Sequence, residues 1–396
     1  MKKQNATRIQ LALFISLATF TTGQSFLLVV LPPLGRQLGF TDIHIGGILS
    51  LSALLIMISA PFWGHLSEHL GRRPILLIAL TGAIFSAIGF ATIIHLRFSG
   101  VLSAYLGLLF IAIIRATQAA TTSGILPAAQ AYMADITSPE QRASGMGILG
   151  AAIGVGVIIG GMLAWGIAGS NPILAFIIIA LLATIAVLTI SGIDKEPVRK
   201  IAKTSDARLP LSQIYCFLAI TLLTISSYSI VLQVSALRLQ DTLGFTTGES
   251  ISRGGAALMA TALAMVLVQA IAIRFLRLNA THLLGVGGAI ATVAMLICTM
   301  VTSYMSILGA LIFLGIGLGL MLTGNLTSLS LHTSANAQGK AAGINVVAQG
   351  LGQSIGPITG ASLYHVSPQT PFLAATIMLA LAWGVGVHSR NIKQRV

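Results

Sequence analysis

The chain has 396 residues, of which 55% are hydrophobic and only 8% are charged, and its mean hydropathy is +0.93. Apolar content of this size exceeds what a soluble core needs, so it indicates a protein embedded in a lipid bilayer. A net charge of +13 would suggest nucleic acid in a soluble protein. Here we assign the charge to loops facing anionic membrane lipids and exclude nucleic acid as a partner.

Twelve apolar segments follow one another in chain order, each long enough to cross a bilayer as a helix. Lipid admits only helices or closed barrels, and the strict alternation of barrel strands is missing from the sequence. We therefore predict an all-α membrane protein with 12 transmembrane helices. The predicted spans are residues 9–31, 44–66, 74–95, 102–132, 142–168, 172–192, 211–235, 251–273, 281–302, 305–331, 341–365 and 371–389.

The distribution of basic residues predicts the orientation of these spans. With the N-terminus inside, 17 of the 22 Lys and Arg residues fall on the inner side. Four fall on the outer side, namely Arg36, Arg97, Arg238 and Arg253. Because cytoplasmic loops carry the excess of basic residues, we expect both N- and C-termini to be cytoplasmic. The expected location is the bacterial inner (plasma) membrane.

The chain divides into two similar halves. We predict an N-terminal six-helix bundle at 1–192, a cytoplasmic linker at 193–210 and a C-terminal six-helix bundle at 211–396. "QRASGMGILGAAIGVGVIIGGML" and "GKAAGINVVAQGLGQSIGPITGASL" each contain a basic residue, a glycine three positions on and a later G-x-x-x-G pair. These pairs are Gly156 with Gly160 and Gly356 with Gly360. Two pseudo-symmetric repeats explain this similarity, and the glycines form either a flexible seam or static packing faces.

The stretch "GHLSEHLGRRP", residues 64–74, concentrates charge between the second and third spans. Gly64 and Gly71 permit a tight turn there, and Pro74 is tolerated in the first turn of the next helix. Glu68 can meet Arg72 or a helix N-terminus in a closed state and be released in an open one. The stretch is either such a gating latch or a solvated topology anchor. The predicted gating residues are Gly64, Glu68, Gly71, Arg72, Arg73, Asp135, Arg142, Gly156, Gly160, Gly356, Pro357 and Gly360.

Arg115 lies near the middle of the fourth predicted span. A charged side chain at this depth is costly and normally faces a polar cavity. Gln118 and Thr122 follow three and seven positions later, so all three residues share one helical face. We predict a central site that binds substrate or couples to protons. The alternative is a structural arginine that bonds neighbouring carbonyl groups.

The acidic residues restrict the chemistry of that site. All nine lie in loops or near the ends of spans, so no carboxylate is predicted in a membrane core. An unpaired buried arginine favours an anionic or zwitterionic substrate, because a carboxylate or phosphate matches its fork. Asp135, near the inner end of the fourth span, is the nearest candidate for a proton carrier.

Other polar residues within the spans are candidates for lining the same cavity. Each either contacts substrate near the midplane or makes a hydrogen bond between helices. They are Gln24, Tyr228, Gln233, Gln269, Asn325, Asn345 and Gln349, of which the last two share a helical face.

Four motifs in order resemble the major facilitator superfamily, in its 12-span drug-efflux-like branch. The stretch at 64–74 resembles the family's G-x-L-[A/S]-D-R-x-G-R-[R/K]-P, with Glu68 in place of Asp and His69 in place of Arg. "RATQAA" resembles the fourth-span R-x-x-Q-G, and "GVIIGG" resembles the antiporter pattern G-P-x-x-G-G with Val157 in place of proline. "GPITGA" keeps that proline as Pro357, and "YMADITSPEQRASGMG" matches the loop between spans four and five.

The resemblance implies the major facilitator fold and a monomeric secondary transporter that works by alternating access. It implies proton-coupled efflux, by antiport, of a small organic molecule such as a siderophore or a drug-like compound. A proton-independent facilitator and a non-transporting membrane sensor remain alternatives. The sequence offers no nucleophile with its base, no metal cluster and no phosphate-binding loop, so we expect neither an enzyme nor a cofactor or metal site.

Overall fold

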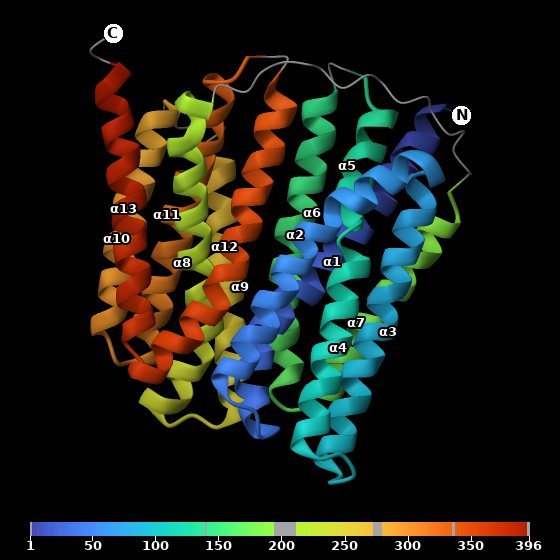
Figure 1. The fold of residues 1–396 in the computed structure, drawn as a ribbon, viewed down its shortest axis with the longest axis vertical. Helices are drawn as coiled ribbons and strands as arrows, with labels where there is room; N and C mark the ends of the chain where they lie inside the picture. The colour runs from blue at the N-terminus through green and yellow to red at the C-terminus, as the bar shows by residue number, and fades with distance from the viewer. Residues whose placement is uncertain (1, 139–140, 194–210, 272–278, 335–336, 394–396) are drawn as a thin grey trace. The chain divides into compact units, whose positions relative to one another are not determined.

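The computed structural model describes residues 2–138, 141–193, 211–271, 279–334 and 337–393, and every regular element in these ranges is a helix (Figure 1). Most of the predicted linker at 193–210 lies outside the described residues. The helices are α1 (Lys2–Gln37), α2 (Asp42–Leu70), α3 (Arg72–Phe98), α4 (Ala104–Thr122), α5 (Ile125–Ile136), α6 (Arg142–Leu163), η1 (Ala164–Ala168), α7 (Pro172–Ser191), α8 (Leu211–Leu243), α9 (Thr247–Ile271), α10 (Ala280–Met300), α11 (Tyr304–Leu331), α12 (Gln338–Val366) and α13 (Thr370–Lys393).

The helices confirm the predicted fold class. Among the described residues, 11 helical segments are long and apolar enough to cross a membrane. The eleventh predicted span, 341–365, is not among these segments, although it corresponds to α12, which has 29 residues. Its apolar run is interrupted by Asn345, Gln349 and Gln353, which lower its hydropathy. The protein is therefore an all-α, multi-pass membrane protein.

At two of the predicted spans, prolines lie inside a helix or next to a helix break. The first span was predicted to end at residue 31, but α1 continues through Pro32 and Pro33 to Gln37. Prolines are tolerated inside membrane helices because neighbouring groups can satisfy the freed carbonyls. The fourth span is broken into α4 and α5, since Pro127 has no N–H to offer the Ser123 carbonyl and the chain bends at Gly124.

Contacts divide the chain into two compact units. The first contains Met1–Ala202 and Thr246–Met259, and the second contains Lys203–Phe245 and Ala260–Val396. The start of α9 thus belongs to the first unit and its remainder to the second. The boundaries 1–192, 193–210 and 211–396 remain a prediction.

Helix pairing follows the same order in both units. In the first, α1 packs on α6 and α3 packs on α7 and α4. In the second, α8 packs on α12 and α10 packs on α13 and α11 (Figure 1). Leu17, Ile75 and Tyr132 are fully buried in the core of the first unit, as are Ile214 and Met321 in the second.

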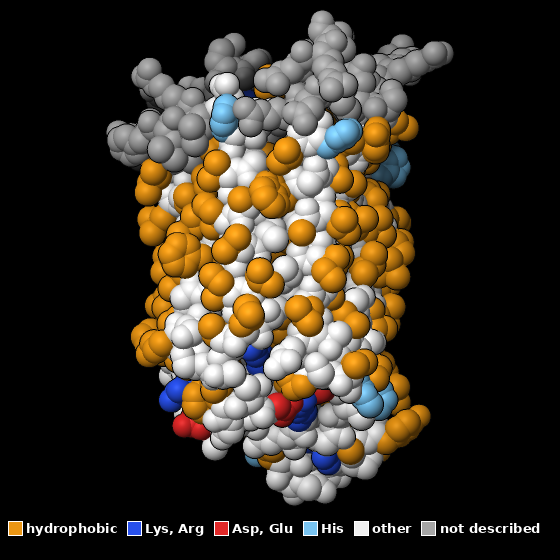
Figure 2. All heavy atoms as spheres, turned by 90° about the vertical axis from the view of Figure 1, so that its left-hand side faces the viewer, with side chains coloured by type: hydrophobic (Ala, Val, Ile, Leu, Met, Phe, Trp, Pro, Cys, Tyr) orange, Lys and Arg blue, Asp and Glu red, His pale blue; other side chains and the backbone are white. Residues whose placement is uncertain are grey.

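The outer flanks of the helices are apolar. Figure 2 shows one face on which hydrophobic side chains cover the sides of the helices, whereas Lys, Arg, Asp and Glu gather near one end. Phe62, Phe85, Leu188 and Ile377 are each at least 60% exposed. Large exposed apolar side chains of this density suit contact with lipid and not with water.

Candidate functional site

Arg115 lies on α4 in the interior of the first unit and is only 3% exposed. Its Nη1 donates a 2.7 Å hydrogen bond to Oε1 of Gln118, one turn further along the same helix. Its Nη2 donates a 2.7 Å hydrogen bond to Oε1 of Gln24 on α1. Two side-chain amides therefore hold the guanidinium between α4 and α1, and the structure brings three of the predicted site residues together.

The polar groups of this site are not all satisfied. Nε of Arg115 and Nε2 of Gln24 are buried without a hydrogen-bond partner. A buried donor left unpaired costs about 1–3 kcal/mol. A small cavity of about 10 Å³, lined by Gly23, Phe90 and Gln118 among others, lies beside the site and approaches the size needed for one water molecule. The site keeps donor capacity that an additional acceptor can use.

Thr122, the third residue of the predicted face, is the last residue of α4. It is 1% exposed, and its hydroxyl donates to the backbone carbonyl of Gln118 at 2.8 Å. This bond occupies the hydroxyl within its own helix. Thr122 therefore supports the turn that carries Gln118.

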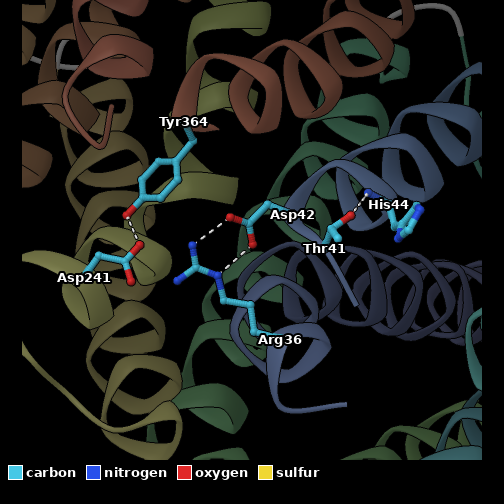
Figure 3. A network of polar contacts seen from close by, with 6 residues as sticks. All are labelled: Arg36, Thr41, Asp42, His44, Asp241 and Tyr364. Carbon is cyan, nitrogen blue, oxygen red and sulfur yellow. Dashed lines mark hydrogen bonds and ion pairs between the residues drawn. The ribbon is translucent and has the colours of Figure 1, made fainter. Parts of the chain in front are cut away.

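The described carboxylates lie at helix ends, as the sequence predicts. Asp42 begins α2 and accepts two 2.7 Å hydrogen bonds from Arg36, while Asp241, near the end of α8, accepts a 2.9 Å bond from the hydroxyl of Tyr364 (Figure 3). Glu68, Asp135 and Glu249 also lie in the first or last turns of their helices. The remaining acids, Glu140, Asp194, Glu196 and Asp206, lie outside the described residues.

A buried polar network joins three helices of the second unit. Asn325 on α11 donates from Nδ2 to Oγ1 of Thr221 on α8 at 2.8 Å and to the carbonyl of Phe217 at 2.9 Å. Oγ1 of Thr221 donates to Oδ1 of Asn345 on α12 at 2.7 Å. Asn325 and Asn345 thus bond between helices, the alternative left open by the sequence. Thr221 was missed, although a threonine inside an apolar span is a recognisable signal.

The other predicted residues of the second unit do not form part of this network. Gln233 on α8 is fully buried, and both atoms of its amide lack a hydrogen-bond partner. Tyr228, Gln269 and Gln349 are partly buried. Among the buried side chains that the structure describes in this unit, Gln233 leaves the most polar atoms without a hydrogen-bond partner.

The predicted loop at 64–74 is mostly helical, so that part of the prediction is wrong. Residues up to Leu70 belong to α2, and Gly64 lies inside the helix opposite Pro127 instead of in the turn. Gly71 alone separates α2 from α3, with φ of 92°, a conformation that favours glycine. Pro74 occupies the first turn of α3, as predicted.

The arginines after this turn tie α3 to other helices of the first unit. Arg72 donates from Nη1 to Oγ of Ser67 at 2.8 Å, and its Nε lies 3.5 Å from Oδ2 of Asp135 on α5. Arg73 donates to the carbonyls of Ile190 and Ser191 at the end of α7, at 3.2 and 2.7 Å.

Two further predicted gating residues lie near the same end of the first unit. Glu68 lies 3.9 Å from His65. Arg142 at the start of α6 donates to the carbonyl of Ala134 on α5 at 3.4 Å. In this structure, Asp135 is the acid that pairs with Arg72.

The glycine pairs pack within each unit. A Cβ on Gly156 would collide with Thr21 and the Ala18 carbonyl on α1, and the Gly156 carbonyl accepts a 3.1 Å bond from Oγ1 of Thr22. Gly160 packs on Ser25 of the same helix. In the second unit, Gly356, Pro357 and Gly360 lie on α12, where both glycines face α8 at Ser229 and Ile230.

A second set of glycine contacts, made by Gly161 of α6 and by Gly169 directly after η1, was missed. Gly161 and Gly169 pack against Gly255 and Gly248 of α9, and Oγ of Ser252 donates to the Trp165 carbonyl in η1 at 2.5 Å. The glycines at 248 and 255 are seven positions apart, a spacing that places them on one face.

These features define a class: a multi-pass membrane transport protein with a buried polar centre and a charged turn at one end. The chain belongs to the Major Facilitator Superfamily, whose family model matches residues 13–357 and 277–392. It is not an enzyme.

Comparisons with known proteins agree with this assignment. Multidrug resistance protein 1 of Bacillus subtilis (strain 168) is 27% identical over 98% of this chain and 99% of its own length. Tetracycline resistance protein, class B, of Escherichia coli is 38% identical over 46% of this chain and 42% of its own length. The crystal structure of a D-xylose-proton symporter matches with a TM-score of 0.78 at 17% identity, covering 96% of both chains, and shows the fold.

Proposed function

We propose that this transporter exports a small organic molecule that carries an anionic or zwitterionic group. The observation that carries the proposal is Arg115, a buried cation held by two neutral amide oxygens and retaining an unpaired Nε donor. A carboxylate or phosphate group offers the guanidinium both a negative charge and acceptor oxygens that match its fork. The two neutral glutamine side chains offer no such charge. Siderophores and acidic drug-like compounds fall within this substrate class.

The direction of transport is proposed from the relatives. Multidrug resistance protein 1 matches nearly the full length of the chain, and tetracycline resistance proteins match its parts at higher identity. The names of these relatives describe resistance to drugs, which efflux explains. Export by alternating access, as a monomer, is the corresponding proposal for this chain.

Proton antiport is the proposed energy source, with Asp135 as the candidate carrier. This carboxylate lies on α5 and is 31% exposed in its side chain, close to Arg72. Protonation of Asp135 would remove its ion pair with Arg72. Binding of a proton would therefore weaken the contact between α3 and α5. The proton-independent facilitator is the second candidate, favoured by the position of every described carboxylate at a helix end.

Flux in proteoliposomes tests the substrate class. Purified protein is reconstituted with anionic, zwitterionic and cationic compounds of similar size. We expect Arg115→Ala to abolish flux of the anionic compounds and Arg115→Lys to restore little of it, since lysine lacks the planar fork. Arg8→Ala, which removes an exposed arginine from α1, is the matched control and should transport normally. Normal anion flux through Arg115→Ala would refute the central site.

The same vesicles test energy coupling. An imposed pH gradient should drive uphill movement of the substrate, and collapse of the gradient should stop it. Flux that is indifferent to the gradient would identify a facilitator, and no flux of any compound would favour a sensor.

The proposed orientation places both termini in the cytoplasm, in a bacterial inner membrane. It rests on the excess of Lys and Arg on one side of the predicted spans. Reporter fusions that are active only in the cytoplasm or only outside it, placed at each terminus, test it directly.

A further inference from the structure

The last turns of α2 carry two exposed histidines that face one another. His65 and His69 are four residues apart, and their rings lie 4.7 Å apart between centroids at 72°. The two Nε2 atoms are 3.3 Å apart, so one Nε2–H donates to the other ring nitrogen. Neither ring is needed for the helix core, because both are exposed to the surroundings.

The distance between the two Nε2 atoms suits two ligands of one tetrahedral metal ion. Zinc binds imidazole nitrogen at about 2.0–2.1 Å. Two nitrogens 3.3 Å apart can both reach one ion at that distance with an N–Zn–N angle of about 107°, close to the tetrahedral value. As the metal enters, the proton between the two Nε2 atoms would be replaced by one on Nδ1 of the same ring, since each ligating nitrogen must offer a lone pair and a neutral imidazole keeps one N–H.

Glu68 is placed to support such a site. Its Oε2 lies 3.9 Å from Nδ1 of His65, on the opposite side of the ring from the facing nitrogens. Metal-binding histidines commonly direct their second N–H to a carboxylate, which fixes the tautomer that leaves the other nitrogen free. A small rotation of the exposed Glu68 side chain brings it within hydrogen-bond distance of Nδ1.

We propose that His65 and His69 form a two-histidine site for a divalent transition metal ion, with zinc favoured by the geometry. Among the described residues no group of three or more His, Cys, Asp or Glu side chains could hold a metal, so water would complete the coordination. Such a chelate joins two successive turns of α2 just before Gly71, and therefore stiffens the end of the helix at the α2–α3 turn. This site is separate from the proposed substrate site at Arg115.

Calorimetric titration with zinc chloride tests the site in the purified full-length protein, prepared with an affinity tag that contains no histidine. We expect His65→Ala, His69→Ala and the double variant each to bind one zinc ion fewer than the wild type. Glu68→Gln should keep the ion but bind it about ten-fold more weakly. His44→Ala, which removes an exposed histidine at the other end of α2, is the matched control and should bind as the wild type does.

Hydrogen–deuterium exchange gives an independent readout. Zinc chloride should slow amide exchange at residues 66–70 in the wild type and in His44→Ala, but not in His69→Ala. The proposal is overturned if the double variant binds as many zinc ions as the wild type with the same affinity, or if zinc leaves exchange at the end of α2 unchanged in the wild type.

Discussion

Arg72 and Asp135 connect the start of α3 to the end of α5, with Nε of the arginine 3.5 Å from Oδ2 of the aspartate. The sequence directed attention to Glu68 as the acid of this region, yet Glu68 lies beside His65 instead. We expect Asp135→Asn to slow flux of the substrate down its own gradient several-fold by loosening this contact, and Glu68→Gln to slow it less. Initial rates in proteoliposomes measure both.

The double variant Arg72→Ala/Asp135→Asn decides whether the two residues act as a pair. If they do, the double variant is no slower than the slower of the two single variants, because the second change removes nothing further. Multiplicative slowing, together with a larger effect of Glu68→Gln, would contradict the pairing and restore Glu68 as the principal gating acid.

Gly156 permits the close approach of α6 to α1. Gly156→Ala places a methyl group on Thr21 and on the backbone of Ala18, so we expect a loss of about 1–3 kcal/mol in stability. Gly150→Ala is the matched control on the same helix, because a Cβ there meets nothing within 4 Å. Thermal unfolding in detergent compares them; equal melting temperatures would mean that α6 does not need this contact.

The Thr221–Asn345 bond should stabilise the α8–α12 contact modestly. Hydrogen bonds between membrane helices average about 0.6 kcal/mol in double-mutant cycles. We expect a coupling of this order between Thr221→Val and Asn345→Leu in the free energy of unfolding in mixed detergent micelles. Gln349→Leu, one turn further along α12, serves as the comparison partner and should show no coupling to Thr221.

Arg238 caps the end of α10 from α8. Its Nη1 and Nη2 donate to the carbonyls of Cys298 and Val301 at 2.6 and 2.7 Å, and its guanidinium lies 4.6 Å from the centre of the Phe372 ring. Since bonds from charged donors are worth about 1.5–3 kcal/mol, we expect Arg238→Ala to destabilise the protein by roughly 2 kcal/mol. A melting temperature as high as that of the exposed-site variant Arg8→Ala would refute this role.

Arg238 also shows the limit of counting charges along a sequence. The sequence assigns it to the outer side, beyond a seventh span predicted at 211–235, but α8 continues to Leu243 and the side chain is only 2% exposed. An apolar helix can continue through an arginine when carbonyl groups at the end of a neighbouring helix accept hydrogen bonds from the guanidinium. Only the tertiary structure, which brings the end of α10 within reach of the Arg238 side chain, supplies those carbonyls.

Arg115 shows the opposite case, in which the sequence was sufficient to find a residue but not its partners. Its isolation in an apolar span marked it, and the i, i+3 spacing correctly joined it to Gln118. Gln24 was a candidate only as one of several polar residues, because nothing local links it to a residue 91 positions away. Thr122 shared the right face, yet its hydroxyl bonds its own backbone.

The sequence by itself determined the class of the molecule. Lipid leaves only helices or closed barrels to satisfy the backbone, and the long apolar segments lack the alternation of barrel strands, so they are helices in a bilayer. The sequence also located the turn at Gly71 and the acid-free centres of the described helices. The tertiary structure decided the pairings, Arg72 with Asp135, Arg238 with α10, and Asn325 and Asn345 with Thr221. These depend on which helix faces meet, and helix faces meet through packing between residues that are distant in the chain.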